Sequence, residues 1–392
     1  MKKISTAEEV INAVFIPRGS VLYTAGNAST PQLLLKQLAR DKSIRNIELI
    51  STFILGDLRE LFYRETCARI THRIIFNGHL SRPAVNKGWA KYQLLHLSDI
   101  PRQVRQHLRP TIVLITVSGP DNGGNYSLGT TVEAIPAAIQ TAKESGGLVI
   151  AERNARMPFV LGSTIPEHDI DYLLDCDYAL PISPVDKPDA RAKKIAKLIA
   201  GLCIEDGCTL QYGIGEVPEA VTEAILDKGV SDLGIRTELF SDGMRTLVER
   251  GIVTNKYANN RFSLATIFLF GAEQGYTWLH YNSSIQSRPA DRTNSVLNIA
   301  KEPKMTAINS AIGVDLHGNI WADSTQARQI YSGVGGQADF LRGAYLSPGG
   351  IPIIAMKSTT PNGLPKILEK CPAGITTTAI AADPVVIITE QG

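Results

Sequence analysis

One carboxylate, Glu238, stands in a segment whose neighbours could help it react. The segment covers residues 233–243 (LGIRTELFSDG), and glycine-rich segments lie on both sides of it, at 213–218 (GIGEVP) and 331–340 (YSGVGGQADF). Glycine lets the backbone approach a ligand closely, and backbone N–H groups stabilise a developing oxyanion. The pattern therefore suits a carboxylate nucleophile served by main-chain donors. A Glu between glycines is also a common loop residue, so on spacing alone both interpretations stay open.

Strand-like and helix-like segments alternate in the first half of the chain. The predicted strands, which are rich in β-branched residues, are 20–24, 47–53, 70–76, 111–117 and 148–152. The predicted helices include 31–40, with Pro31 in its first turn, and 134–145. The run 111–117 (TIVLITV) is typical of a strand that is buried on both faces. This alternation predicts a mostly parallel sheet covered by helices.

A proline-rich stretch at 181–188 (PISPVDKP) is the best candidate for a linker, because proline stiffens the chain and blocks helix and inner-strand pairing. Beyond it the alternation resumes, with predicted helices at 189–204 and 219–228 and predicted strands at 209–212, 263–269, 306–312 and 351–356. We therefore predict two open, mostly parallel α/β domains, residues 1–188 and residues 189–392, the second of which carries Glu238.

Composition and motifs disfavour several classes of protein. Among 392 residues, 40 are basic and 38 are acidic, and no basic stretch alternates with aromatic residues, so we expect no nucleic-acid partner. The five scattered cysteines predict neither a zinc site nor a disulfide framework, and we expect no metal. The sequence has no apolar run long enough to predict a membrane span, and this favours a cytoplasmic protein. The segment 213–218 lacks the third glycine of the dinucleotide-binding fingerprint, which disfavours a dehydrogenase.

Several motifs, taken in order, resemble the acetyl-CoA hydrolase/transferase family of coenzyme A transferases, and within it the 4-hydroxybutyrate CoA-transferase branch. In the second half they are 210–215 (LQYGIG), 233–243, 307–316 (AINSAIGVDL), 331–340 and 346–350 (LSPGG). The first half agrees through 81–86 (SRPAVN), 117–121 (VSGPD) and 169–172 (DIDY). The resemblance covers nearly the whole chain and implies two α/β domains of the CoA-transferase (NagB/RpiA-like) type.

The resemblance implies a ping-pong exchange of coenzyme A (CoA) between an acyl-CoA and a carboxylic acid. Glu238 would attack the thioester, and the CoA thiolate would return to form a glutamyl-CoA thioester, which an acceptor carboxylate would then open. CoA is a substrate in this scheme, and no cofactor is needed. A homodimer or a dimer of dimers is also expected from the family.

The same resemblance assigns roles to further residues. Asn309 would hydrogen-bond the Glu238 carboxylate and orient it. The expected oxyanion and substrate-binding residues are glycine-rich backbone positions: Gly26, Gly213, Ile214, Gly215, Gly335 and Gly336. The expected CoA-binding residues are Gln337, Ser347, Gly349, Gly350 and Lys366.

The substrate and the balance of activities stay open at this stage. The chain has no His near Gly26 and carries Glu216 after Gly-Ile-Gly, two departures from its relatives, and Glu216 could repel a second carboxylate or bind a hydroxyl. Acetate, propionate, butyrate, 4-hydroxybutyrate, succinate and itaconate are all open. Two alternatives also remain, an acyl-CoA hydrolase (thioesterase) on the same scaffold and a non-catalytic CoA-binding protein.

Overall fold

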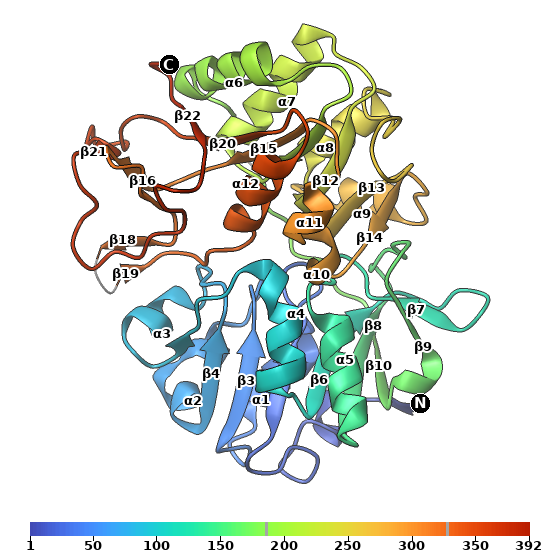
Figure 1. Cartoon of the computed structure of the whole chain (residues 1–392). Helices are drawn as coiled ribbons and strands as arrows, with labels where there is room; N and C mark the ends of the chain where they lie inside the picture. The colour runs from blue at the N-terminus through green and yellow to red at the C-terminus, as the bar shows by residue number, and fades with distance from the viewer. Residues whose placement is uncertain (185–186, 327–328) are drawn as a thin grey trace.

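The computed structural model describes residues 1–184, 187–326 and 329–392, and it contains two large sheets (Figure 1). The first sheet has eight strands, all paired in parallel, in the order β1-β10-β8-β6-β2-β3-β4-β5. Its strands are β1 (Lys2–Ile4), β2 (Val21–Thr24), β3 (Ile47–Ser51), β4 (Ile70–Ile74), β5 (Lys91–Tyr92), β6 (Ile112–Val117), β8 (Leu148–Asn154) and β10 (Tyr172–Cys176). All six residues of β6 are buried, as the apolar run predicts.

The second sheet has seven strands, again paired in parallel, in the order β14-β13-β12-β11-β15-β20-β22. Its strands are β11 (Thr209–Tyr212), β12 (Gly234–Phe240), β13 (Ser263–Phe268), β14 (Ile285–Ser287), β15 (Met305–Asn309), β20 (Ile351–Ala355) and β22 (Val386–Ile388). Because β12 lies between β11 and β13, the residues on it are held rigidly inside the sheet.

Small sheets extend the two halves. They are formed by β7 (Asn125–Ser127) with β9 (Thr164–Pro166), by β16 (Gly313–Asp315) with β17 (Ile320–Trp321) and β21 (Ile367–Leu368), and by β18 (Ser324–Gln326) with β19 (Gln329–Ile330).

Helices cover the faces of both sheets (Figure 1). Those of the first half are α1 (Gln32–Arg40), α2 (Arg64–Arg69), α3 (Arg82–Asn86), α4 (Ile100–Gln103) and α5 (Ile135–Glu144). Those of the second half are α6 (Ala190–Cys203), α7 (Glu216–Lys228), α8 (Asp242–Glu249), α9 (Glu273–Leu279), α10 (Ala290–Thr293), α11 (Val296–Ile299) and α12 (Gln337–Leu346). Helix α10 packs against α4, so it lies at the boundary between the two halves.

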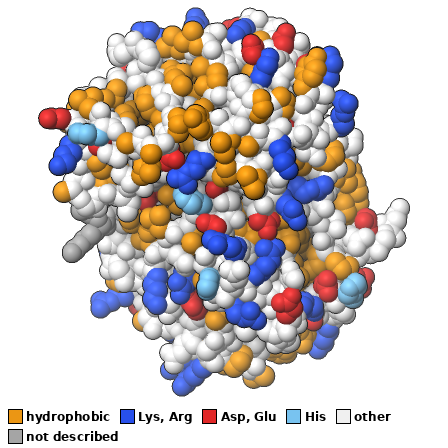
Figure 2. Space-filling view, in the orientation of Figure 1, with side chains coloured by type: hydrophobic (Ala, Val, Ile, Leu, Met, Phe, Trp, Pro, Cys, Tyr) orange, Lys and Arg blue, Asp and Glu red, His pale blue; other side chains and the backbone are white. Residues whose placement is uncertain are grey.

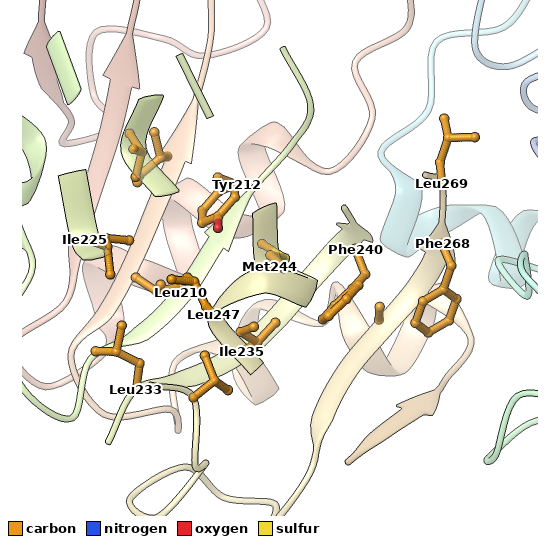
Figure 3. Packing of buried hydrophobic residues seen from close by; sticks show 14 of the residues in the cluster. Leu210, Tyr212, Ile225, Leu233, Ile235, Phe240, Met244, Leu247, Phe268 and Leu269 are labelled. Carbon is orange, nitrogen blue, oxygen red and sulfur yellow. The ribbon is translucent and has the colours of Figure 1, made fainter. Parts of the chain in front are cut away.

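The largest apolar core lies beneath the second sheet and extends into the first half of the chain. Phe240 on β12 and Phe268 on β13 lie side by side in it, with ring centroids 5.9 Å apart (Figure 3). Leu210 and Tyr212 on β11 belong to the same cluster and are fully buried. This packing stabilises the strands whose carboxyl ends lead into the Glu238 region.

The predicted α/β architecture with mostly parallel sheets is confirmed, with differences at the ends of elements. Helix α7 begins at Glu216, three residues before its predicted start. The segment around Glu238 is a regular strand, β12, and not a loop. The sheets part between β10 and β11, while the division at residue 188 stays a prediction. Val185 and Asp186 of the predicted linker lie outside the described residues.

The surface shows no single basic stripe on the visible face, where Lys and Arg side chains are interspersed with Asp and Glu (Figure 2). None of the helices in residues 1–184, 187–326 and 329–392 is both long enough and apolar enough to cross a bilayer. Within the same ranges, no three His, Cys, Asp or Glu side chains gather as a metal-binding group.

Candidate active site

Glu238 lies near the carboxyl end of β12, where open parallel sheets usually bind ligands. Two residues before it, Arg236 forms a buried ion pair with Glu302, with 2.7 Å between Nε and Oε1. Arg236 also donates to the carbonyl oxygen of Arg292, 3.3 Å away, just beyond which Asn294 follows α10. These contacts tie the strand that carries Glu238 to the segment that carries Asn294.

Two groups contact the Glu238 carboxylate directly. The side-chain amide of Asn294 donates to Oε2 over 3.3 Å, and the backbone N–H of Gly336 lies close enough to the carboxylate to lower its pKa. A Cβ atom on Gly336 would lie 2.1 Å from Glu238 Oε2 and 2.1 Å from Asn294 Nδ2, and one on Gly335 would lie 3.3 Å from Oε1. Only glycine therefore allows this loop to reach the carboxylate.

A cleft of about 780 Å³ opens in front of Glu238. That volume is in the range of small-molecule and cofactor sites. Besides Glu238, the cleft brings together these residues proposed from sequence: Gly213, Ile214, Gly215, Asn309, Gly335, Gly336, Gln337 and Lys366. Two segments more than a hundred residues apart in sequence, 213–215 and 335–337, thus line one cavity together with Glu238.

Four residues proposed for the site line neither this cleft nor the smaller cavity behind Glu238. Ser347 is buried, donates to the carbonyl oxygen of Glu302 (2.6 Å) and accepts from the backbone N–H of Met305 (3.0 Å). A Cβ on Gly350 would lie 2.1 Å from the carbonyl oxygen of Ala344. The turn 347–350, including Gly349, therefore packs against the end of α12, and its contact with CoA stays a prediction.

Gly26 is the fourth of these residues. A Cβ at this position would lie 2.7 Å from the carbonyl oxygen of Phe53. The glycine therefore allows the ends of β2 and β3 to pack closely, and it is its neighbour Asn27 that reaches a cavity. Gly26 itself is not among the residues that line this cavity, and its contact with substrate stays a prediction.

The hydrogen bond predicted from Asn309 to Glu238 is not among those of the described residues. Asn309 lies at the end of β15 and donates to Oε1 of Gln211, 3.0 Å away on the paired strand β11. Asn294 contacts Glu238 instead. No sequence motif marked Asn294, because its role depends on where α10 packs against β12 and not on its local pattern.

The acidity of Glu238 reflects its surroundings. Burial and the nearby Asp339 carboxylate raise the pKa of Glu238 to about 7, while the donors on Gly336 and Asn294 oppose this shift. Asp339 is buried and accepts hydrogen bonds from Ser98, at 3.2 Å from its backbone nitrogen and 2.7 Å from Oγ. Among the described residues, no cation forms an ion pair with Glu238. The carboxylate is therefore free to react near neutral pH.

A second, smaller cavity of about 200 Å³ lies behind Glu238. It shares Phe76, Ile214, Glu238, Leu239 and Gly335 with the larger cleft, so Glu238 stands where the two cavities meet. Most of its wall is apolar. Its other polar side chains are those of Asn27, Thr52 and Glu133. Asn27 follows the predicted Gly26, whereas the sequence marked neither Thr52 nor Glu133 as part of a site.

Two lysines, Lys357 and Lys366, line the large cleft. Lys357 contacts Glu216 and also forms a 2.9 Å ion pair with Asp189. Lys357 thus offsets the charge of the Glu216 carboxylate. Both roles considered for Glu216, repelling a second carboxylate and binding a hydroxyl, stay open. Lys366 donates to the carbonyl oxygen of Ala311 over 2.7 Å, and burial lowers its pKa.

Comparison with known proteins agrees with these observations. The acetyl-CoA hydrolase/transferase N-terminal domain family matches residues 1–184, and the corresponding C-terminal domain family matches residues 271–392. A 4-hydroxybutyrate coenzyme A transferase from Clostridium kluyveri is 34% identical over 398 aligned positions, which cover 100% of this chain and 90% of the relative.

Two further proteins extend the comparison. A succinyl-CoA:acetate/propanoyl-CoA:succinate CoA transferase from Fasciola hepatica is 33% identical, over 96% of this chain and 79% of the relative. The crystal structure of RipA from Yersinia pestis superposes with a TM-score of 0.91 at 28% identity and covers 100% of this chain and 89% of RipA.

Proposed function

Because this chain belongs to the acetyl-CoA hydrolase/transferase family, we propose that Glu238 carries CoA as a glutamyl thioester in a ping-pong exchange. The chain is an enzyme of the CoA-transferase type, with acyl-CoA and carboxylate substrates. One observation carries the proposal. In the part of the chain that the structure describes, Glu238 has no ion-pair partner, and it stands at the junction of a large cleft and a small apolar cavity, beside the backbone of Gly336.

In the first half-reaction, a Glu238 oxygen attacks the thioester carbonyl of the donor, and the carbon–sulfur bond breaks. This leaves an acyl–glutamyl anhydride and a CoA thiolate. The thiolate then attacks the glutamyl carbonyl carbon and expels the acyl group as a free carboxylate, which leaves CoA bound to Glu238 as a thioester. Splitting one exchange into two attacks on activated carbonyls lowers each barrier.

The second half-reaction repeats these steps in reverse. The acceptor carboxylate attacks the glutamyl carbonyl and releases the thiolate, which attacks the acceptor's carbonyl and frees Glu238. Each attack places negative charge on a carbonyl oxygen, so backbone N–H groups of 213–215 and 335–336 are the proposed donors. Losing one such donor typically costs about 3–4 kcal/mol in transition-state stabilisation.

CoA and the acyl group would lie on different sides of Glu238. Gln337 and Lys366 line the large cleft and are the proposed contacts for CoA, whereas the acyl group lies on the other side of Glu238. CoA serves as a substrate, and no cofactor is required. The enzyme works in the cytoplasm as a homodimer or a dimer of dimers, which sedimentation of the purified protein tests directly.

Trapping the covalent intermediate tests the mechanism. Enzyme incubated with butyryl-CoA and no acceptor should gain the mass of CoA on the peptide that contains Glu238. Borohydride should then reduce that thioester and abolish activity, while enzyme treated with borohydride alone stays active. A Glu238→Ala variant that still exchanged CoA at the wild-type rate would end the proposal.

The hydrolase alternative follows from the family name, which covers both activities. In a hydrolase, water would attack the acyl–glutamyl anhydride or the glutamyl thioester. Release of free CoA at the same rate with and without an acceptor acid would favour hydrolysis over transfer. Calorimetric binding of CoA without any exchange or hydrolysis would support a non-catalytic CoA-binding protein.

A further inference from the structure

The small cavity behind Glu238 has an unusual charge balance. Its wall is mostly apolar, with Phe53, Ile267 and Leu269 among its residues. Two carboxyl groups, Glu133 and Glu238, face into it, and no Lys, Arg or His is among its described lining residues. We call this cavity the acyl chamber.

Glu133 is built into the chamber and is not a chance surface group. Its side chain is 2% exposed, and it accepts hydrogen bonds from Asn27 Nδ2 (3.0 Å) and Thr52 Oγ1 (2.5 Å). Both partners are also buried. These are the contacts of its carboxyl group in the part of the chain that the structure describes, and neither partner carries a charge.

The backbone holds Glu133 between the two halves of the molecule. Its N–H donates to Thr266 Oγ1 (3.0 Å) on β13, and its carbonyl oxygen accepts from the N–H of Ala290 (2.9 Å) on α10. Its φ angle is +36°, in the left-handed region that few residues other than glycine adopt. Such strain persists only where surrounding contacts enforce it, and it is frequent at functional sites.

The size of the acyl chamber limits what it can hold. Its volume is about 200 Å³. An apolar cavity of about 150 Å³ accommodates benzene, so this one has room for an acyl chain of roughly four to six carbons. The entrance lies beside Glu238, where the thioester carbonyl of the proposed reaction must stand.

The charges of the chamber decide which chains it accepts. An acyl group with a second carboxylate would bring a third carboxyl group into an apolar space that offers no cation. An isolated buried charge is costly, and a like charge nearby adds to the cost. An uncharged hydroxyl faces no such cost, because a carboxyl group with two donors has room for a further hydrogen bond. Burial also raises the pKa of Glu133, to about 7, so its environment already disfavours negative charge.

We propose that the acyl chamber holds the acyl group and that Glu133 makes it select uncharged short acyl groups, plain or hydroxylated, over acyl groups with a second carboxylate. This inference rests on the proposed function and names the substrate class of the same site. Glu133 acts here as a specificity-determining residue and takes no part in the covalent steps.

A donor panel tests the inference. The full-length enzyme is assayed at pH 8 with acetate as acceptor, and kcat/KM is measured for butyryl-CoA, 4-hydroxybutyryl-CoA and succinyl-CoA. We expect the two uncharged donors to agree within about tenfold and to exceed succinyl-CoA by at least about 100-fold, since juxtaposed like charges cost several kcal/mol. Glu133→Gln, which removes the charge but keeps the shape, should reduce this preference at least tenfold.

Glu152→Gln is the matched control. Glu152, on β8 of the first sheet, is also a buried carboxyl group with a raised pKa. It accepts hydrogen bonds from Leu34 and Tyr178, and it lines neither cavity. This variant should leave the ratio between donors unchanged. If circular dichroism shows that Glu133→Gln does not fold, the ratio between donors in the wild-type enzyme tests the inference.

The outcomes separate the two proposals. Wild-type enzyme that uses succinyl-CoA as well as butyryl-CoA overturns the inference and leaves the CoA-transferase mechanism intact. An unchanged donor ratio in folded Glu133→Gln also overturns the role of Glu133. Failure to exchange CoA with any of the three donors overturns the proposed function and this inference with it.

Discussion

The Glu238 carboxylate and the backbone of Gly336 are so close that the α-carbon of Gly336 has no room for a methyl group. The missing Cβ would lie 2.1 Å from Glu238 Oε2, well inside van der Waals contact, and the nearby N–H of Gly336 lowers the pKa of the same carboxylate. The loop after β19 thus sets the position of the side chain on β12. A nucleophile and one of its proposed oxyanion donors are thereby fixed relative to each other.

Replacing Gly336 by Ala should therefore inactivate the enzyme without unfolding it. The added methyl group must displace either the Glu238 carboxylate or the Asn294 amide, and a displacement of about 1 Å can cost about 100-fold in rate. We expect kcat to fall at least that far in a steady-state assay. Gly201→Ala is the control, because a Cβ at Gly201 in α6 meets nothing within 4 Å. Wild-type kcat in the Gly336 variant would show that the loop does not position Glu238.

Two substitutions of Glu238 should distinguish the loss of the nucleophile from a change in its position. Glu238→Gln keeps the shape but removes the nucleophile, and losses of about 10⁴-fold or more are usual for such changes. Glu238→Asp keeps a carboxylate but withdraws it by about one bond length, so we expect a loss of about 100-fold and a detectable thioester. Trapping by mass spectrometry measures both. A thioester on the Gln variant would mean that another residue carries CoA.

The pH dependence of kcat/KM should show an acid limb close to pH 7. Glu238 must be ionised to attack, and its pKa is raised to about 7, so activity with the free enzyme should fall as the pH drops through that value. Asp339→Asn removes a neighbouring negative charge that contributes to the raised pKa, so the limb should move to lower pH. A limb that does not move in this variant would contradict the coupling between the two carboxyl groups.

The two asparagines can be told apart by mutation. Asn294→Ala removes a donor that favours the ionised form of Glu238, so the acid limb should shift to higher pH and kcat should fall by about tenfold. Asn309→Ala removes a bond to Gln211 and should leave the acid limb in place. The sequence-based assignment of Asn309 as the orienting residue predicts the reverse, and pH–rate profiles of the two variants decide between them.

Stability should improve when the charge of Glu238 is removed, but only above a certain pH. The pKa in the folded protein lies above the ordinary value of 4.5, so ionisation opposes folding: the cost is absent below about pH 4.5 and fully present above about pH 7. Glu238→Gln should thus raise the melting temperature by about one to a few degrees at pH 8 and by less at pH 4.5. Equal effects at both pH values in differential scanning calorimetry would contradict a raised pKa.

Much of the fold could be predicted because its signal is local. The strands β2, β6, β8, β11 and β20 were each placed within two residues, since apolar runs between turn residues reflect burial inside a parallel sheet. Element ends were less accurate, as the start of α7 shows, because they depend on the capping geometry of one turn. The glycines around Glu238 leave a loop open as one interpretation, although the segment is an inner strand.

The candidate site also combines features that the sequence predicts with features that only the structure shows. The sequence by itself determined that Glu238 and the glycine segments 213–215 and 335–336 belong together, because ordered motifs can be seen without knowing any contact. Only the tertiary structure decided that Asn294, 56 residues from Glu238, contacts its carboxylate, and that Glu133 meets Asn27 across 106 residues. Such contacts depend on how α10 and two separate sheets pack, and packing leaves no periodic trace around either partner.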